Sequence, residues 1–268
     1  MALLQVNYYS NALCRFNQFQ MILANDVPEL LKQNSEYYNR PMKTVILLHG
    51  YSGSNMDWMT GSNVNELAVK YNLAIVMPNA DNSFYLNAPG SGNKYQDLIE
   101  VDLINYLRDT FGLAKNPEDT IIGGLSMGGF GAIRFGLHRP DLFGKMFGLS
   151  SAMIVNEISK MPADAAGNAI ADRTYYENVF GDLSKLKESE NDPEFLVKQR
   201  LAKGEKIQPI YMACGTEDFL LGYNRDFYNF LKENGVDVEM HESTGIHEWK
   251  FWNEYLEPSL RWALELDK

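Results

Sequence analysis

The chain has 268 residues, of which 45% are hydrophobic and 12% aromatic, which is enough apolar material for one large α/β domain or two small ones. Its 24 basic and 35 acidic residues give a formal net charge of −11, and no basic patch with interleaved aromatic residues occurs. An acidic protein repels phosphate backbones and anionic lipid surfaces, so the composition argues against nucleic acid and membranes as partners.

The start of the chain lacks the features of a secretion signal. Residues 1–7 contain no basic n-region, no long apolar stretch and no small-residue cleavage site, and no apolar run reaches the length of a membrane span. We therefore expect a cytoplasmic protein. The two cysteines, Cys14 and Cys214, lie in apolar, strand-like segments, which predicts reduced and buried thiols.

Eight segments have the pattern of β-strands. The first two, residues 5–10 and 14–23, are separated only by a short polar turn, which predicts an antiparallel edge to the sheet. The others are short apolar runs of the kind that is covered on both faces. They are residues 44–48, 73–77, 120–124, 145–149, 209–214 and 236–241.

Helical patterns lie between these strands. They cover residues 63–70, 96–111, 127–138, 224–233 and a last stretch from 248 towards 266. Alternation of strands and helices predicts a mostly parallel sheet with helices on both faces.

The segment 152–206 differs from the rest of the chain. It is rich in Asp, Glu, Lys, Asn and Ala, and it contains no clear strand. We expect it to be an insertion between the sixth and seventh strands that lies over the active-site end of the sheet as a small lid. A single domain of residues 1–268 is the simplest organisation.

Residues 124–128, Gly-Leu-Ser-Met-Gly, are the most informative stretch of the chain. They follow the apolar run at 120–123 and precede a segment that can be helical. A strand, Gly-x-Ser-x-Gly and a helix in this order predict a nucleophile elbow, a tight turn that presents the hydroxyl of Ser126 at the tip of the sheet. The turn needs glycine at Gly124 and Gly128, because a Cβ there would collide with the neighbouring strand or helix.

A serine hydroxyl needs a base to take its proton, and histidine is the usual one because its pKa lies near neutral pH. Among the four histidines, His138 ends the helix that starts at the serine and is too far away, and His241 falls within the last predicted strand. His247 lies in the loop 244–249 after that strand, where active groups gather in an open parallel sheet. We therefore expect His247 to be the general base, and His49 to shape the loop after the third strand through hydrogen bonds.

The acid of the triad is expected after the penultimate strand, where the sequence reads Gly-Thr-Glu-Asp at 215–218. A carboxylate there would accept a hydrogen bond from the imidazole, fix its tautomer and stabilise its positive charge. Asp218 is the preferred candidate and Glu217 the alternative. Asp182 and Asp192 in the insertion are weaker candidates because they follow no strand.

Two backbone N–H groups should stabilise the oxyanion of the reaction. Met127, directly after the serine, would supply one, and Tyr51, in the loop after the third strand, the other. Aromatic and apolar side chains beside the strand-end loops are candidates for lining an acyl or aromatic pocket. They are Trp58, Phe84, Tyr85 and Trp249, together with Met56. The chemistry requires no metal and no cofactor.

Four motifs together resemble a known group. They are His-Gly at 49–50, Gly-Leu-Ser-Met-Gly-Gly at 124–129, Gly-Thr-Glu-Asp at 215–218 and Gly-Ile-His-Glu-Trp at 245–249. They are similar to the esterase D branch of the α/β-hydrolases, and above all to bacterial tributyrin esterase-like enzymes, with feruloyl and acetylxylan esterases as neighbours. The resemblance extends over nearly the whole chain.

This resemblance implies an α/β-hydrolase fold and a serine carboxylesterase that cleaves short-chain acyl or aryl esters through an acyl-enzyme, including feruloyl or acetyl esters of plant polysaccharide. It also implies a tendency to form homo-oligomers. The same branch contains S-formylglutathione hydrolases, which typically carry cysteine and threonine after His-Gly, whereas residues 51–54 here are Tyr-Ser-Gly-Ser. A thioesterase of that type, or an acyltransferase with the same triad, is the alternative.

Overall fold

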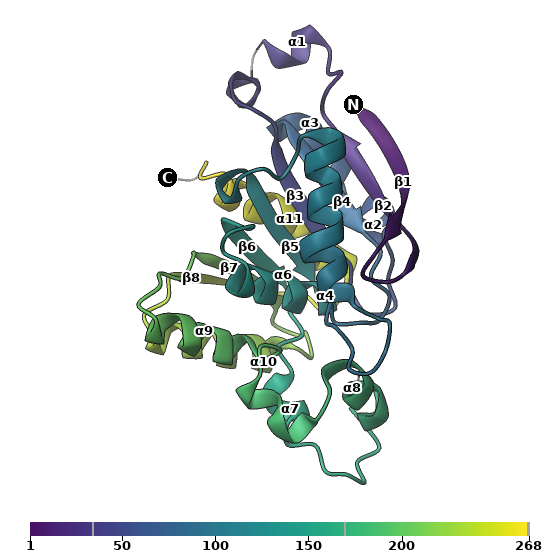
Figure 1. The fold of residues 1–268 in the computed structure, drawn as a ribbon. Helices are drawn as coiled ribbons and strands as arrows, with labels where there is room; N and C mark the ends of the chain where they lie inside the picture. The colour runs from purple at the N-terminus through teal and green to yellow at the C-terminus, as the bar shows by residue number, and fades with distance from the viewer. Residues whose placement is uncertain (34, 169, 267–268) are drawn as a thin grey trace.

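The computed structural model describes residues 1–33, 35–168 and 170–266, which form one eight-stranded sheet flanked by helices (Figure 1). The strand order is β1-β2-β4-β3-β5-β6-β7-β8. Strand β2 pairs antiparallel with both β1 and β4, and strands β3 to β8 are parallel to one another. The strands are β1 (Ala2–Ser10), β2 (Arg15–Leu23), β3 (Lys43–Leu48), β4 (Leu73–Pro78), β5 (Thr120–Leu125), β6 (Lys145–Leu149), β7 (Ile210–Gly215) and β8 (Val238–Ser243). The α/β-hydrolase architecture and its antiparallel edge are therefore confirmed.

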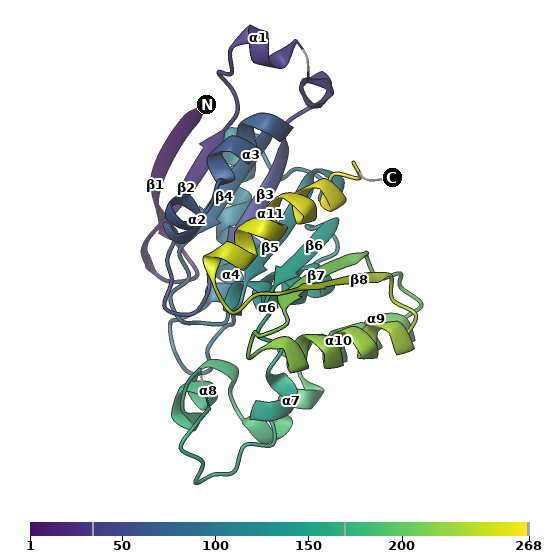
Figure 2. The same ribbon diagram turned by 180° about the vertical axis from the view of Figure 1, so that it is seen from behind.

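Side chains of the central strands alternate between two buried layers, as the period of two in a strand requires. In β3, Ile46 and Leu48 pack into one layer, while Val45 and Leu47 pack into the other. The first layer is covered by the helical segment from Tyr95 to Phe111 and by α6 (Met127–His138), α9 (Pro193–Ala202) and α10 (Leu221–Glu233). The second is covered by α2 (Asp57–Gly61), α3 (Val64–Tyr71) and α11 (Trp249–Ala263), which face the viewer in Figure 2.

The helix predicted at 96–111 is present, but it is not a regular α-helix. It begins with α4 (Tyr95–Asp97), continues through η2 (Leu98–Leu103), α5 (Ile104–Tyr106) and η3 (Leu107–Phe111), and η2 and η3 are π-helical. It ends at Gly112, whose φ of 67° is the left-handed conformation that glycine adopts at helix ends.

The insertion between β6 and β7 only partly matches its prediction. Its helices are α7 (Val155–Ile158), α8 (Arg173–Phe180), η5 (Leu183–Glu188) and α9. Helices α7 and α8 lie beyond the carboxyl ends of the strands (Figures 1 and 2), whereas α9 packs along α6 at the flank. Only the first part of the insertion therefore covers the end of the sheet where the candidate site lies.

The prediction of a buried thiol is confirmed for Cys214 and wrong for Cys14. Cys214 is buried in β7, but Cys14 is exposed, and both thiols are free. The second strand begins at Arg15, so Cys14 lies in the turn before it, with a φ of 52°. Its side chain faces solvent, whereas Leu13 beside it is buried in the core.

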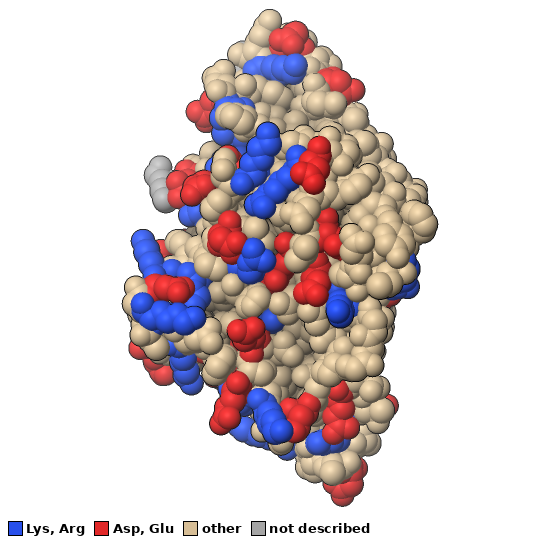
Figure 3. Space-filling model, in the orientation of Figure 1, with Lys and Arg blue, Asp and Glu red and all other residues tan. Residues whose placement is uncertain are grey.

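Charged side chains of both signs are interspersed on the face shown in Figure 3. Among the described residues, no helix is both long enough and apolar enough to cross a bilayer.

Candidate active site

The elbow forms as the motif predicts. β5 ends at Leu125, α6 begins at Met127, and Ser126 between them has a φ of 54° and a ψ of −120°. A positive φ is rare for a residue with a side chain, so the surrounding structure holds Ser126 in a strained conformation. A Cβ at Gly124 would lie 2.4 Å from the carbonyl carbon of Gly128, and one at Gly128 would lie 2.2 Å from the oxygen of Leu48. These contacts explain the two glycines of the motif.

Asp218 and His247 are joined by a hydrogen bond. His247 Nδ1 lies 2.9 Å from Asp218 Oδ2, and the Asp218 side chain is fully buried. Since an ionised carboxylate can only accept, Nδ1 carries the proton and Nε2 is left as a base. The imidazole is flanked by the rings of Phe219 and Trp252, with centroid distances of 4.8 and 5.0 Å. These contacts fix the orientation of the ring.

The surroundings of Asp218 keep its carboxyl group ionised. Burial works to raise its pKa, but the hydrogen bond and charge of His247 and two further hydrogen bonds together hold the pKa below its ordinary value. The Leu220 N–H, 2.8 Å from Asp218 Oδ1, and the Ser150 hydroxyl act in the same direction. Ser150 is itself held by the indole N–H of Trp252, which donates to its Oγ over 3.1 Å.

Ser126 and His247 line one cavity of about 440 Å³. The other residues around it are Gly50, Tyr51, Ser52, Gly53, Asp57, Leu125, Glu248, Trp249 and Trp252. Ser126 is buried except for 8% of its surface, and within the described residues its hydroxyl makes no hydrogen bond to His247. Contacts of this kind tighten when substrate binds, so the open geometry is compatible with proton transfer.

The loop after β3 is held by His49, whose ring is buried. Its Nδ1 lies 2.8 Å from the Gly50 oxygen, and its Nε2 accepts the Ala80 N–H over 3.0 Å. Burial lowers the pKa of His49, and both ring nitrogens are already used, so the ring is neutral and structural. The backbone N–H groups of Tyr51 and Met127 find no protein acceptor within the described part of the chain. Both remain available to an oxyanion.

The profile of the esterase family, described as "Putative esterase", matches residues 30–263. The chain belongs to this family. A curated acetyl esterase of Caldicellulosiruptor saccharolyticus is 40% identical over 262 residues, which are 98% of each chain.

Two solved structures from Staphylococcus aureus are similar to the esterase over 98% of both chains. The fluorophosphonate-binding serine hydrolase FphF is 30% identical with a TM-score of 0.83. The S-formylglutathione hydrolase FrmB is 28% identical with a TM-score of 0.81. The esterase is therefore a carboxylic ester hydrolase, which confirms the family and the class of reaction expected from the motifs.

Of the aromatic residues predicted to bind substrate, only Trp249 lines the cavity of the esterase. Trp58, Phe84 and Tyr85 are at most 1% exposed and do not reach it. Met56 is 43% exposed and lies outside its lining. The prediction that these four residues contact substrate is therefore corrected.

The three buried rings have structural contacts. The Trp58 indole donates to the Leu48 oxygen over 3.1 Å and packs edge-on against Trp249. The Tyr85 hydroxyl donates to the oxygen of His49, and the Phe84 ring contacts other buried aromatic rings. Each ring is buried because the core removes more of its apolar surface from water than a cavity wall would.

Sequence reasoning missed Trp252 and Glu248. Trp252 lies one helical turn after Trp249 and on the same side of α11, so the spacing i, i+3 from Trp249 could have predicted it. Glu248 precedes the helix directly, and only the path of its loop brings it to the cavity.

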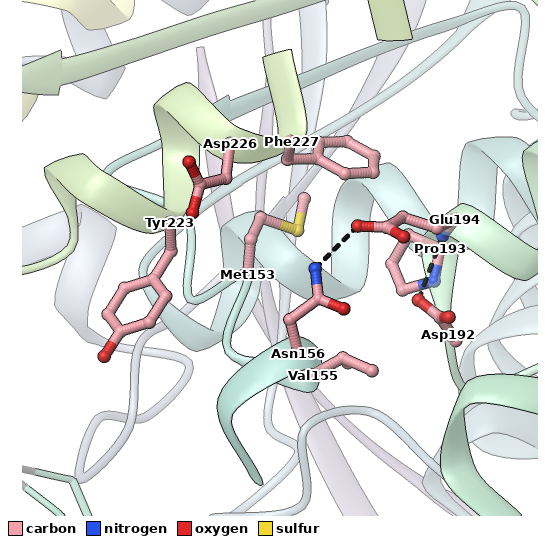
Figure 4. Close-up of a pocket in the computed structure, with 9 residues that line it drawn as sticks. All are labelled: Met153, Val155, Asn156, Asp192, Pro193, Glu194, Tyr223, Asp226 and Phe227. Atoms are coloured by element: carbon pink, nitrogen blue, oxygen red, sulfur yellow. Dashed lines mark hydrogen bonds between the residues drawn. The ribbon is translucent and has the colours of Figure 1, made fainter. Parts of the chain in front are cut away.

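The alternative carboxylates have structural contacts. Glu217 Oε2 accepts the Gly245 N–H over 2.7 Å and ties the loop after β7 to the histidine loop. Asp182 caps η5, and Asp192 caps α9 through the Glu194 N–H. Figure 4 shows Asp192 at the edge of a hollow of about 20 Å³, where Asn156 donates to Glu194. That space accommodates about one water molecule and no substrate.

Proposed function

We propose that the esterase hydrolyses small acyl and aryl esters through a covalent acyl-enzyme, with Ser126 as nucleophile, His247 as general base and Asp218 as the acid that orients it. The observation that supports this best is the Asp218–His247 hydrogen bond beside a strained serine in the same cavity. Nucleophile, base and orienting acid on three separate strand-end loops are the arrangement of a serine hydrolase triad.

Acylation begins when Ser126 Oγ attacks the ester carbonyl and Nε2 of His247 takes its proton. The tetrahedral oxyanion accepts hydrogen bonds from the N–H groups of Tyr51 and Met127. His247 then returns the proton to the departing alcohol. Water, deprotonated by the same imidazole, attacks the acyl-enzyme and releases the acid. Side chains, backbone and water supply every step.

The shape and charge of the cavity limit the substrate. Trp249 and Trp252 form its apolar side, and Asp57 and Glu248 are its charged residues apart from the triad. The lining contains no lysine or arginine, so a thiol that carries carboxylates, such as glutathione, finds no partner for its charge there. A neutral ester with a short acyl group fits this lining better, and the relationship to an acetyl esterase favours acetyl.

An ester panel tests the proposal. We expect p-nitrophenyl acetate and acetylated xylo-oligosaccharides to be hydrolysed with higher kcat/KM than methyl ferulate and S-formylglutathione. Adding an acceptor alcohol and analysing the products distinguishes hydrolysis from acyl transfer. A preference for S-formylglutathione, or transfer in place of hydrolysis, would favour the alternative with the same triad.

A further inference from the structure

The end of β6 and the loop after it lie between two of the loops that carry the catalytic triad. The chain there joins the nucleophile elbow twice, because the Ser126 N–H donates to the Leu149 oxygen over 2.9 Å and the Ala152 N–H donates to the Ser126 oxygen over 3.0 Å. On the other side, the Ser150 N–H donates over 2.7 Å to the oxygen of Ala213 in β7, the strand before the acid of the triad. This loop therefore connects the nucleophile with the strand that leads to the acid.

Ser150 in this loop has a strained backbone and a buried side chain. Its φ is 47°, which is rare for a residue with a side chain, and its exposed fraction is 0%. Glycine would relieve this strain, so serine is present here at a conformational cost. Strained residues of this kind are concentrated at functional sites, which points to a use for the Ser150 hydroxyl.

The Ser150 hydroxyl lies between an indole and a carboxylate. Trp252 Nε1–H donates to Ser150 Oγ over 3.1 Å, and because an indole can only donate, the hydroxyl keeps its own proton for a second bond. The Asp218 carboxylate and the Cys214 thiol are both within its reach. Burial raises the pKa of the Cys214 thiol, which therefore stays protonated and neutral. The charged carboxylate is the stronger acceptor, so the Ser150 proton is directed to Asp218.

Trp252 also contacts the base of the triad. Its ring lies edge-on against the imidazole of His247, with a centroid distance of 5.0 Å and an interplanar angle of 88°, and it lines the active-site cavity. Because its indole N–H is bonded to Ser150, the ring cannot rotate without breaking a buried hydrogen bond. Trp252 thus holds the imidazole through its ring and the carboxylate through the serine hydroxyl.

We propose that Ser150 and Trp252 are positioning residues that orient the Asp218–His247 pair for proton transfer. The indole donates to the Ser150 hydroxyl and this hydroxyl donates to Asp218, while His247 donates to the same carboxylate. Without the hydroxyl, the carboxylate loses one donor and the buried indole N–H loses its acceptor. This inference rests on the proposed ester hydrolysis and adds two residues that act through the triad.

The first experiment removes the hydroxyl with and without the backbone strain. Ser150→Ala keeps a side chain at the positive φ, whereas Ser150→Gly also relieves the strain. We expect both variants to lower kcat for p-nitrophenyl acetate by about tenfold at unchanged KM, because the carboxylate loses a hydrogen bond that orients it. The acid limb of the kcat/KM pH profile should move to higher pH, since a carboxylate with one donor fewer attracts the protonated imidazole more strongly.

Ser151→Ala is the matched control for these variants. The Ser151 hydroxyl is also buried, and within the described residues it has no hydrogen-bond partner. This variant should retain the kcat and the pH profile of wild type. A kcat that is equal in all four proteins, or a loss in Ser150→Ala that Ser150→Gly restores, would contradict the role of the hydroxyl.

A double-mutant cycle tests the link between the two positioning residues. Trp252→Phe keeps an aromatic ring beside His247 but lacks the N–H that bonds to Ser150. Combined with Ser150→Ala, it should lower kcat by less than the product of the two single losses, because both substitutions break the same hydrogen bond. Losses that multiply would show independent contributions and contradict the shared role.

A measurement without turnover separates this inference from the proposed function. The proton on Nδ1 of His247, which is bonded to Asp218, should give a downfield NMR signal that is absent from His247→Gln. We expect this signal to shift in Ser150→Ala and Ser150→Gly and to keep its position in Ser151→Ala. An unchanged signal in both Ser150 variants would overturn the positioning role. A wild-type protein that hydrolyses no ester would contradict the proposed function, while the NMR result would still decide the role of Ser150.

Discussion

At the scale of single residues, the site depends on the conformation of Ser126 and on the bond between Asp218 and His247. Ser126 has a positive φ, and the buried carboxylate of Asp218 bonds to Nδ1 of the imidazole, which leaves Nε2 without a proton. Each of these features can be tested by a substitution that changes few atoms.

Ser126→Ala should lower kcat/KM for p-nitrophenyl acetate by at least about 10⁴-fold, because the nucleophile is removed and only binding and oxyanion stabilisation remain. Labelling by a fluorophosphonate should also disappear. Ser184→Ala, at an exposed position in the insertion, is the matched control and should retain full activity. An alanine variant at position 126 with near-normal turnover would refute the nucleophile assignment.

Asp218→Asn should lower kcat by roughly 10⁴-fold, because an amide favours the wrong tautomer of His247. Glu217→Gln still accepts the Gly245 N–H and should keep most of the activity. The reverse ranking would identify Glu217 as the acid.

A comparison of wild type with Asp218→Asn also tests the electrostatics of Asp218. Its pKa is lower in the folded state than in the unfolded chain, so ionisation stabilises the fold above pH ~4 and this contribution disappears as the pH falls through the folded pKa. Wild type should exceed Asp218→Asn in stability by more at pH 7 than at pH 3. Urea unfolding at both pH values measures the difference, and an equal gap would contradict the ion pair.

At the scale of elements, α6 packs so closely against β3 that no side chain fits at position 128. Gly128→Ala would place its Cβ 2.2 Å from the oxygen of Leu48, a backbone atom that cannot move without shifting the strand. We expect a loss of about 3 kcal/mol or more of unfolding free energy, measured by urea denaturation.

Gly222→Ala is the matched control for this prediction. Gly222 lies in α10, and a Cβ there meets nothing within 4 Å. Alanine should therefore be neutral or stabilise the fold by about 0.5–1 kcal/mol. Similar effects at the two positions would show that packing against β3 is not what requires Gly128.

At the scale of the whole molecule, the reactivity of the two thiols shows whether the fold is intact. Burial raises the pKa of Cys214 to about 12, whereas Cys14 is exposed in a turn. A thiol reagent at pH 8 should label one cysteine in native protein and two in denaturant, since the thiolate is the reactive species. Cys14→Ser should show no fast labelling, and fast labelling of two cysteines in native wild type would contradict the burial of Cys214.

The parts of the site that depend on neighbouring residues in the chain were predictable. The strand, the Gly-x-Ser-x-Gly turn and the helix occupy about twenty consecutive residues, and local sterics dictate their geometry. The proximity of Asp218 and His247 was predictable because parallel strands end at the same edge of a sheet, so their following loops converge.

Other features depend on contacts between distant segments. Trp58, Phe84 and Tyr85 occur in or beside the segments that follow strands, as Trp249 does, but only tertiary packing decides which ring enters the core and which lines the cavity. The contacts of Tyr175 with Tyr51 and Asn82 join three separated parts of the chain, and no local pattern encodes them.

The amino-acid sequence by itself determined the α/β-hydrolase framework, the elbow and the identities of the three triad candidates. It could do so because apolar runs, glycine sterics and strand-end loops act over short stretches or follow from sheet topology. Only the tertiary structure decided the lining of the cavities, the exposure of Cys14 and the position of α9 beside α6. Those features arise from burial, which depends on every element that packs nearby.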